Sequence, residues 1–523
     1  MDFHTGKIQK YFVWLIIAAA IFFRLNHYLD NLSFWADEAW LAIDLQRRTF
    51  SDIVLNRNIS SYYAVPPAGF LLILKLFVLF FGNHEFSYRL LALICSIASL
   101  SLFWRMLKKN SSGTTAIIAI AIFAFCDQVI FQSAQLKQYS SDILITIIIW
   151  TLAFSSLSKP LRIHQIIFIC LLGWICILVS HPAILAMTGI AVAQIFFKKE
   201  RKALLKQQLV IFISWALFFL FAYFYYYQMN FSNPRMISCQ NHYFLSLSEL
   251  SKSIIMIREM FINPGGLQWQ IAFPVFSFGV WHLAKTNKNL FFPLILPVII
   301  AFFAAFLNKY PFGGRFLLFL VPALFIFIGE GFSFLLKKKA LLLPGSVFLF
   351  LLLLPHVSQS FHHIFKPRYI AETRPLLEFL KEEQKSDDVI YLNNEAQYAY
   401  HYYIRALKFK QKIPLTGIFN DVTSRENAGE NFLYLYHCDR GFDSKMFVSG
   451  KLLPGRIKPA NHNLASLENK GRAWVLLAQA DPEAEKHIVH TFKNEGALIT
   501  NERWPGAVLY LFEFCDEKPN YKK

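Results

Sequence analysis

The chain has 523 residues, of which 55% are hydrophobic and only 16% are charged. Soluble domains carry about 25% charged residues, so this composition excludes an ordinary soluble protein. The formal net charge of +18 does not indicate a nucleic-acid partner, because the basic residues cluster in short runs between apolar segments, where they report membrane orientation.

Long apolar runs occur throughout the first 355 residues and predict transmembrane helices. The runs 291–306 and 316–327 contain no charged residue over most of a bilayer-crossing length. The run 11–23 follows two lysines but lacks a small-residue cleavage site, so we interpret it as an uncleaved first span and not as a signal peptide. The predicted spans are 11–29, 86–106, 113–131, 142–158, 164–180, 182–197, 208–228, 268–284, 290–307, 315–335 and 340–355.

The apolar stretch 66–82 decides the predicted topology. If it lies along the membrane interface, all basic runs share one side, with 16 Lys and Arg in 39 inside residues against 9 in 112 outside residues. Lys75, in the middle of the stretch, agrees, because a charge at the bilayer centre costs at least about 2.5 kcal/mol. The inside segments are 1–10, 107–112, 159–163, 198–206, 285–289 and 336–339, and the outside segments are 30–85, 132–141, 229–267 and 308–314.

These patterns predict an all-α polytopic bundle of about 11 transmembrane helices in the plasma (inner) membrane. The N-terminus is expected in the cytoplasm. The outer first loop, 30–85, is expected to carry an interfacial helix. We expect residues 1–355 to form this membrane domain and residues 356–523 to form a small extracytoplasmic α/β domain that folds alone.

Residues 356–523 have a mixed polar composition with charges of both signs. Their periodicity predicts helices over 372–383 and 395–407 and strands over 389–392, 432–436, 473–477 and 507–514. The sequence does not decide whether Cys438 and Cys515 form a disulfide, since that requires an oxidising compartment. The four cysteines in apolar segments, at positions 95, 126, 170 and 176, are expected to be buried thiols, and no metal site is predicted.

Six polar residues lie near the predicted outer face. They are Asp37 and Glu38 after the first span, Lys137 and Asp142 before the fourth, His181 between the fifth and sixth, and Arg315 at the start of the tenth. This shared side follows from a charge count that takes no account of chemistry, so it is more informative than any one residue.

Asp37 and Glu38 stand among aromatic residues in the segment Phe34–Trp40. At the outer end of a span a carboxylate is partly desolvated and can serve as a base. The alternative is an interfacial aromatic belt followed by two acids in the first turn of a helix, where the helix dipole favours them. The residues alone leave both interpretations open.

Three arginines lie near the same face. Arg315 follows Gly313 and Gly314, which would let the backbone approach a phosphate closely, or it is a charge that reaches water from a helix end. Arg24 and Arg89 are expected to be interfacial anchors.

Lys137, Asp142 and His181 have structural alternatives as well. Lys137 and Asp142 either pair with each other along a helix or contact the donor phosphate, the sugar or the acceptor. His181 is a sugar or metal contact, or a polar residue of a tight turn between helices. We predict no cofactor and leave a divalent metal open.

Four sequence stretches follow one another along the predicted membrane domain. They are the Asp37–Glu38 pair with AVPPAGF (64–70), then GNHEFSYRL (82–90), QLKQYSSD (135–142) and YPFGGRFL (310–317). In this order they resemble GT-C glycosyltransferases. The similarity is to the glycosyltransferase family 39 group, which includes protein O-mannosyltransferases, lipid A aminoarabinose transferase and rhizobial galacturonic acid transferases. It covers about residues 1–355, and in that group an interfacial helix follows the acidic loop.

The resemblance implies an inverting transfer of a sugar from a polyprenyl phosphate donor to a glycan, lipid or protein acceptor on the extracytoplasmic face. It implies that Asp37 is the general base and that Glu38 orients or supports it. A cation near the leaving phosphate stabilises the transition state more than the ground state, which makes Arg315 and Lys137 the candidates for that role.

Two other classes of function stay open. One is a transporter or flippase of an envelope lipid, although we find no inverted repeat or matching broken helices. The other is a degenerate family member with a structural or binding role. Within the enzyme class, the runner-up is a protein O-mannosyltransferase, although the C-terminal sequence shows no β-trefoil pattern. The sequence does not identify the sugar, the acceptor or the oligomeric state.

Overall fold

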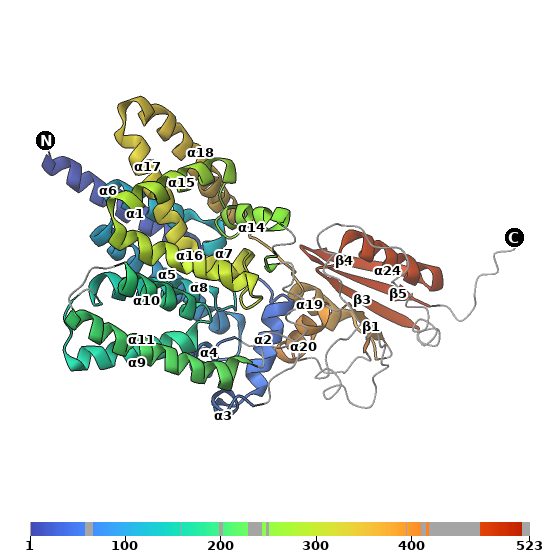
Figure 1. Cartoon of the computed structure of the whole chain (residues 1–523). Coiled ribbons are helices and arrows are strands. Elements are labelled where there is room, and N and C mark those ends of the chain that lie inside the picture. The colour runs from blue at the N-terminus through green and yellow to red at the C-terminus, as the bar shows by residue number, and fades with distance from the viewer. Residues whose placement is uncertain are drawn as a thin grey trace. The chain divides into compact units, whose positions relative to one another are not determined.

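The computed structural model describes residues 2–57, 66–157, 159–197, 202–228, 243–246, 250–386, 388–393, 395–408, 415–417 and 471–514. The chain divides into two compact units (Figure 1). The helical unit comprises Met1–Asp30, Phe50–Arg57 and Ala64–Pro367, and the sheet unit comprises Asn31–Thr49, Asn58–Tyr63 and Arg368–Lys523. These units are groups of mutually contacting residues, so the predicted domains 1–355 and 356–523 stay a prediction about independent folding.

Apolar helices build the helical unit, and every predicted span overlaps one or more of them. Six helices in the described part are long and apolar enough to cross a membrane, and five further apolar helices are shorter. The protein is therefore an integral multi-pass membrane protein. The helices are α1 (Asp2–Leu29), α3 (Phe50–Val54), α4 (Ala68–Phe81), α5 (Glu85–Asn110), α6 (Gly113–Phe125), α7 (Asp127–Gln132), α8 (Tyr139–Ser155), α9 (Ile163–Val179), α10 (Ala183–Phe196), α11 (Lys202–Ala222), η1 (Tyr223–Tyr227), α14 (Leu250–Ile262), α15 (Trp269–Thr286), α16 (Lys288–Phe306), η3 (Gly314–Leu320), α17 (Val321–Lys337), η4 (Lys339–Leu341) and α18 (Leu342–Phe365).

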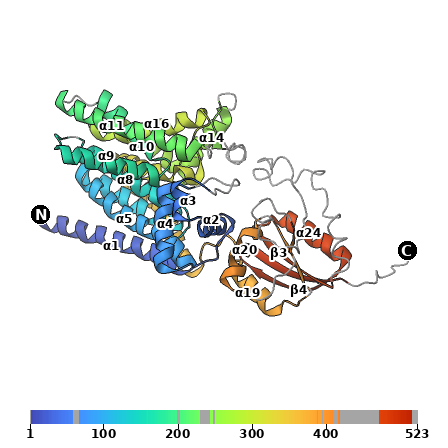
Figure 2. The same cartoon turned by 90° about the horizontal axis from the view of Figure 1, so that it is seen from below.

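Helix α4 covers the stretch that decides the topology. It packs against α5 and α9, and Gly69 lies so close to α9 that a Cβ would come within 2.8 Å of the Leu178 carbonyl oxygen. Its other end exposes Leu79, Phe80 and Phe81. In Figure 2, α4 runs across the direction of α1 and α5. A crossing helix with an exposed apolar end is compatible with an interfacial position, which stays a prediction.

Helix α17 lies at the centre of the helical unit and is buried along almost its whole length. Glycines allow its neighbours to come close. A Cβ on Gly279 of α15 would lie 1.8 Å from the Phe327 carbonyl oxygen, and one on Gly331 would lie 2.0 Å from the Val275 carbonyl oxygen. Small residues at a helix interface permit such close backbone contact in a membrane, where van der Waals packing holds helices together.

The predicted span 113–131 is broken at Cys126 into α6 and α7. The guanidinium of Arg24 lies at this break, donating to the carbonyl oxygens of Phe123 (3.3 Å) and Ala124 (3.0 Å) and to the Ser96 hydroxyl (2.9 Å). Arg24 is fully buried, so its prediction as an interfacial anchor is wrong, and Arg89 is buried too. Arg24 instead supplies hydrogen-bond donors to carbonyls that the interrupted helix leaves without partners.

The sheet unit is a five-stranded mixed sheet with helices. The strand order is β2-β1-β3-β5-β4; β1 is parallel to β2 and β3, whereas β5 is antiparallel to β3 and β4. The predicted strand 432–436 and the Cys438–Cys515 pair lie outside the described residues. The elements are α2 (Ala36–Arg47), α19 (Arg374–Glu383), β1 (Val389–Leu392), α20 (Ala396–Ala406), β2 (Leu415–Gly417), β3 (Arg472–Ala478), α24 (Pro482–Glu495), β4 (Ala497–Trp504) and β5 (Ala507–Glu513).

Both faces of the sheet are covered. On one face Phe492 of α24 packs with Tyr391 and Val475. Alternation of side chains along a strand turns Trp474 to the other face, where its ring contacts Phe379 of α19. The sheet therefore has an apolar core on each side, as a three-layer α/β arrangement requires.

Candidate functional site

The acidic pair lies in the first turn of α2, within the sheet unit. The Trp35 carbonyl accepts hydrogen bonds from the amides of Glu38 (3.0 Å) and Ala39 (2.9 Å), which begins the helix. Glu38 is fully buried, whereas Asp37 is half-buried. The helix dipole favours negative charge at both positions, and only Asp37 keeps part of its side chain accessible.

Asp142 lies in the first turn of α8, where the sequence places it, and is buried. The Ser180 hydroxyl is a polar neighbour of its carboxylate, and Oδ1 has no hydrogen-bond partner among the described residues. A buried carboxylate with unused acceptor capacity in a membrane bundle is a candidate for function.

Arg315 lies on η3, which packs against α8. Its guanidinium carbon lies 5.7 Å from the ring centre of Tyr139, three residues before Asp142, and 6.0 Å from that of Phe316. The structure thus brings Arg315 and the start of α8 together. Lys137 is half-buried and belongs to the turn that precedes α8, so it lies in the same region.

The two glycines before Arg315 have a structural explanation that the sequence did not reveal. A Cβ on Gly313 would lie 2.4 Å from the Tyr243 ring, and Gly314 has a positive φ of 51°. The Phe312 amide also donates to the Tyr243 carbonyl at 2.9 Å. An aromatic ring therefore occupies the space that was expected to let the backbone approach a phosphate.

His181 lies in the turn between α9 and α10, next to Ser180. Its ring meets the Tyr227 ring edge to face, with centroids 4.7 Å apart. Among the residues that the structure describes, no three His, Cys, Asp or Glu side chains are grouped so as to hold a metal ion. The helical unit thus gathers Asp142, Arg315, Lys137 and His181 around the start of α8, whereas Asp37 and Glu38 belong to the sheet unit.

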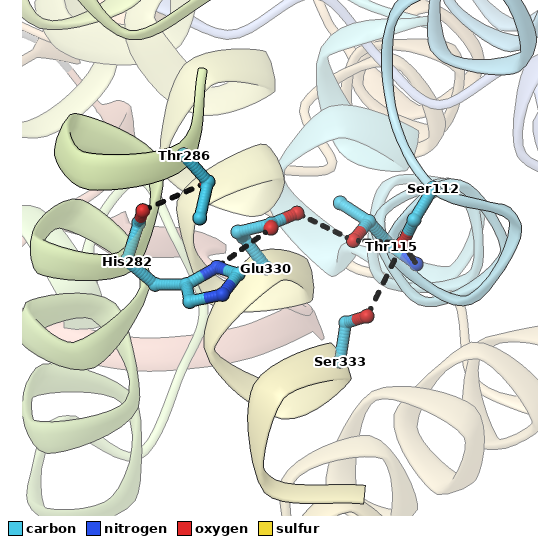
Figure 3. Close-up of polar contacts among 6 residues, drawn as sticks. All are labelled: Ser112, Thr115, His282, Thr286, Glu330 and Ser333. Atoms are coloured by element: carbon cyan, nitrogen blue, oxygen red, sulfur yellow. Dashed lines mark hydrogen bonds and ion pairs between the residues drawn. The ribbon is translucent and has the colours of Figure 1, made fainter. Parts of the chain in front are cut away.

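Sequence reasoning missed another buried carboxylate, Glu330, within the apolar helix α17. Figure 3 shows that it joins three helices: the Thr115 hydroxyl of α6 donates to Oε2 at 2.6 Å, and His282 Nδ1 of α15 lies 2.9 Å from Oε1. Ser112 bridges Thr115 (2.8 Å) and Ser333 (3.2 Å). The single acid in an otherwise apolar run was the available signal.

Replacing Glu330 by Gln is expected to lower the stability of the helical unit by about 1–2 kcal/mol, because the amide lacks the carboxylate's negative charge and offers one acceptor oxygen in place of two. Thermal unfolding of the purified protein in detergent measures this loss. Thr286→Val is the control, since the Thr286 hydroxyl donates to the His282 carbonyl one turn before it and does not contact Glu330 in the described part of the chain. If the Glu330→Gln protein is as stable as the Thr286→Val protein, Glu330 does not stabilise the contact between the three helices.

No protein-family model matches the chain, and no curated protein matches it. Solved structures do. The apo structure of ArnT from Cupriavidus metallidurans aligns with a TM-score of 0.53 at 12% identity, covering 96% of this chain and 98% of ArnT. ArnT bound to undecaprenyl phosphate aligns with a TM-score of 0.50 at 10% identity, with the same coverage.

A third solved structure is the Archaeoglobus fulgidus oligosaccharyltransferase tethered with an acceptor peptide containing the NVT sequon. It aligns with a TM-score of 0.50 at 11% identity, covering 97% of this chain and 74% of that one. At such identities the likeness establishes the fold, and the chain has the GT-C fold.

Proposed function

We propose that this protein is an inverting glycosyltransferase. It transfers a sugar from a polyprenyl phosphate donor to an envelope glycan, glycolipid or protein acceptor on the extracytoplasmic face. The observation that carries the proposal is the ArnT fold, which extends over nearly the whole length of both chains and includes an ArnT structure bound to undecaprenyl phosphate. The acidic pair at the start of α2 adds chemistry to that fold.

In the proposed reaction an acceptor hydroxyl oxygen attacks the anomeric carbon from the face opposite the phosphate. The bond between the anomeric carbon and the phosphate oxygen breaks, and polyprenyl phosphate leaves with the electron pair. Asp37 receives the hydroxyl proton. The half-buried position of Asp37 supports this role, and the full burial of Glu38 supports an orienting role.

The leaving phosphate gains negative charge, so a fixed cation beside it lowers the barrier. Arg315 and Lys137 are the proposed cations, and Asp142 and His181 are proposed to contact the sugar or the acceptor. The position of all four around the start of α8 supports a single binding region in the helical unit.

The test is a transfer assay with the purified protein and polyprenyl phosphate sugars, together with mass spectrometry of envelope glycans and glycolipids from cells with and without the gene. A hexose or uronic acid missing without the gene identifies the substrate. Unchanged glycans with loss of a lipid from the outer leaflet favour the flippase alternative, and a missing sugar on proteins favours a protein O-mannosyltransferase.

The proposed orientation has the N-terminus in the cytoplasm and the C-terminal part outside, which the bias of Lys and Arg toward the inside segments supports. A reporter that is active only outside the cytoplasm is expected to work when fused after residue 380 and to fail when fused at Lys202. The reverse result at both sites would mean that the stretch 66–82 crosses the membrane.

A further inference from the structure

We infer that the segment 368–408 of the sheet unit positions the acidic pair, and that it does so through Glu372, Arg374 and Tyr403. The inference rests on the proposed function, in which Asp37 is the base. It gives a role to residues 368–408, for which sequence reasoning found none. Its basis is a set of hydrogen bonds to the residues that lead into α2.

Both carboxylate oxygens of Glu372 accept hydrogen bonds from Ser33. The Ser33 amide donates to Oε1 at 3.1 Å and to Oε2 at 3.3 Å, and the Ser33 hydroxyl donates to Oε2 at 2.9 Å. Both residues are buried. Hydrogen bonds to an ionised group are about twice as strong as neutral ones, so this contact fixes the backbone four residues before Asp37.

Two further contacts hold the neighbouring residues. The Arg374 guanidinium donates to the Asn31 carbonyl at 2.7 Å, and the Phe34 amide donates to the Tyr403 hydroxyl at 2.8 Å. The Phe34 ring packs against the Tyr402 ring, with centroids 4.9 Å apart. The same segment therefore contacts residues on both sides of Ser33. After them, α2 packs against α20.

The holding segment is itself fixed to the sheet. The Glu372 amide donates to the Pro505 carbonyl at 2.9 Å, in the turn between β4 and β5. Next to it, Gly506 has a φ of 71°, and a Cβ there would lie 1.9 Å from the Ile370 carbonyl oxygen. Hydrogen bonds and one close backbone contact therefore connect the sheet, through residues 370–374, to the residues that lead into α2.

Positioning of this kind affects turnover strongly, since a misplacement of about 1 Å costs on the order of 10²-fold in rate. In the full-length protein, Glu372→Gln and Tyr403→Phe are each expected to lower kcat about tenfold while the KM for the donor changes by less than about twofold. If Glu372 acts through Ser33, the double variant Ser33→Ala with Glu372→Gln is expected to lose no more activity than the worse single variant.

Glu485→Gln is the matched control, because it makes the same substitution at another hydrogen-bonded acid of the sheet unit. Glu485 accepts from Arg503 and from the Tyr510 hydroxyl, and the Arg503 hydrogen bond lowers the Glu485 pKa. We expect wild-type kcat in this variant. Thermal unfolding of all variants separates loss of position from loss of fold.

Hydrogen exchange provides a readout that needs no substrate. Glu372→Gln is expected to increase exchange of the α2 amides, whereas Glu485→Gln leaves it unchanged. Wild-type kcat and wild-type α2 exchange in both Glu372→Gln and Tyr403→Phe overturn the positioning inference, even if Asp37→Asn is inactive. A wild-type protein without any transferase activity overturns the proposed function, and the exchange result then still decides whether this segment holds α2.

Discussion

The Asp37→Asn protein is expected to lose turnover by a factor on the order of 10² to 10⁴ while remaining folded. The amide keeps the size and the hydrogen-bonding reach of the carboxylate but cannot accept the acceptor's proton. Asp37 is half-buried in the first turn of α2, and Asn is nearly isosteric with Asp, so the substitution leaves the packing there almost unchanged. The assay uses purified protein with a polyprenyl phosphate sugar donor, and thermal unfolding checks that the variant is folded.

Glu38→Gln is the matched comparison for Asp37→Asn, because it makes the same chemical change one residue later on the same helix. A supporting carboxylate orients the base but does not receive the proton, so the loss of turnover is expected to be smaller. If Asp37→Asn stays within about threefold of wild type while Asp142→Asn is inactive, the role of base moves to Asp142.

The membrane-embedded helices were largely predictable, because an apolar run of span length has no other stable environment. The break at Cys126 was not, since its carbonyls are satisfied by Arg24, which lies 100 residues from Ala124. No local pattern reports such a distant partner. Where an apolar helix is interrupted, the compensating group has to be found in the folded structure.

The sheet unit shows where local patterns weaken. The strand 389–392 was predicted with the bounds that β1 has, because its residues form a short apolar and aromatic run, and the structure buries all four. Helix α24 and strand β4 were missed. The helix Pro482–Glu495 is mostly polar, and β4 has no fully buried residue, so neither shows a strong apolar periodicity. Their pairing and packing partners, β5 and the sheet, decide their structure.

The candidate site, like the sheet unit, was only partly predictable from the sequence. Residue type and predicted side of the membrane were enough to propose the acidic pair and Arg315 as candidates. The sequence had no means to show that the segment leading into α2 is held by Glu372, which lies 339 positions later. Nor could it show that the Tyr243 ring explains Gly313. Both facts depend on contacts between distant parts of the chain, which periodicity does not record.

Arg315→Ala is expected to raise the KM for the donor and to lower kcat, with a combined loss in kcat/KM on the order of 10²-fold. The reason is that the proposed leaving group, a phosphate, gains charge in the transition state and a nearby guanidinium stabilises it. Its place over the Tyr139 ring, three residues before Asp142, supports this role.

Arg315→Lys tests which property of the side chain matters. It keeps the charge but replaces the planar fork of the guanidinium by a single ammonium, so it is expected to recover only part of the activity. Arg258→Ala is the control, because the Arg258 guanidinium also lies over an aromatic ring, that of Trp269 at 5.5 Å, and has no proposed role in the reaction. If the Ala and Lys variants at position 315 both match wild type and the Arg258→Ala control in kcat and KM, then Arg315 does not contact the donor phosphate. Lys137 then becomes the cation to test, because it precedes α8 in the same region and is the other proposed positive charge.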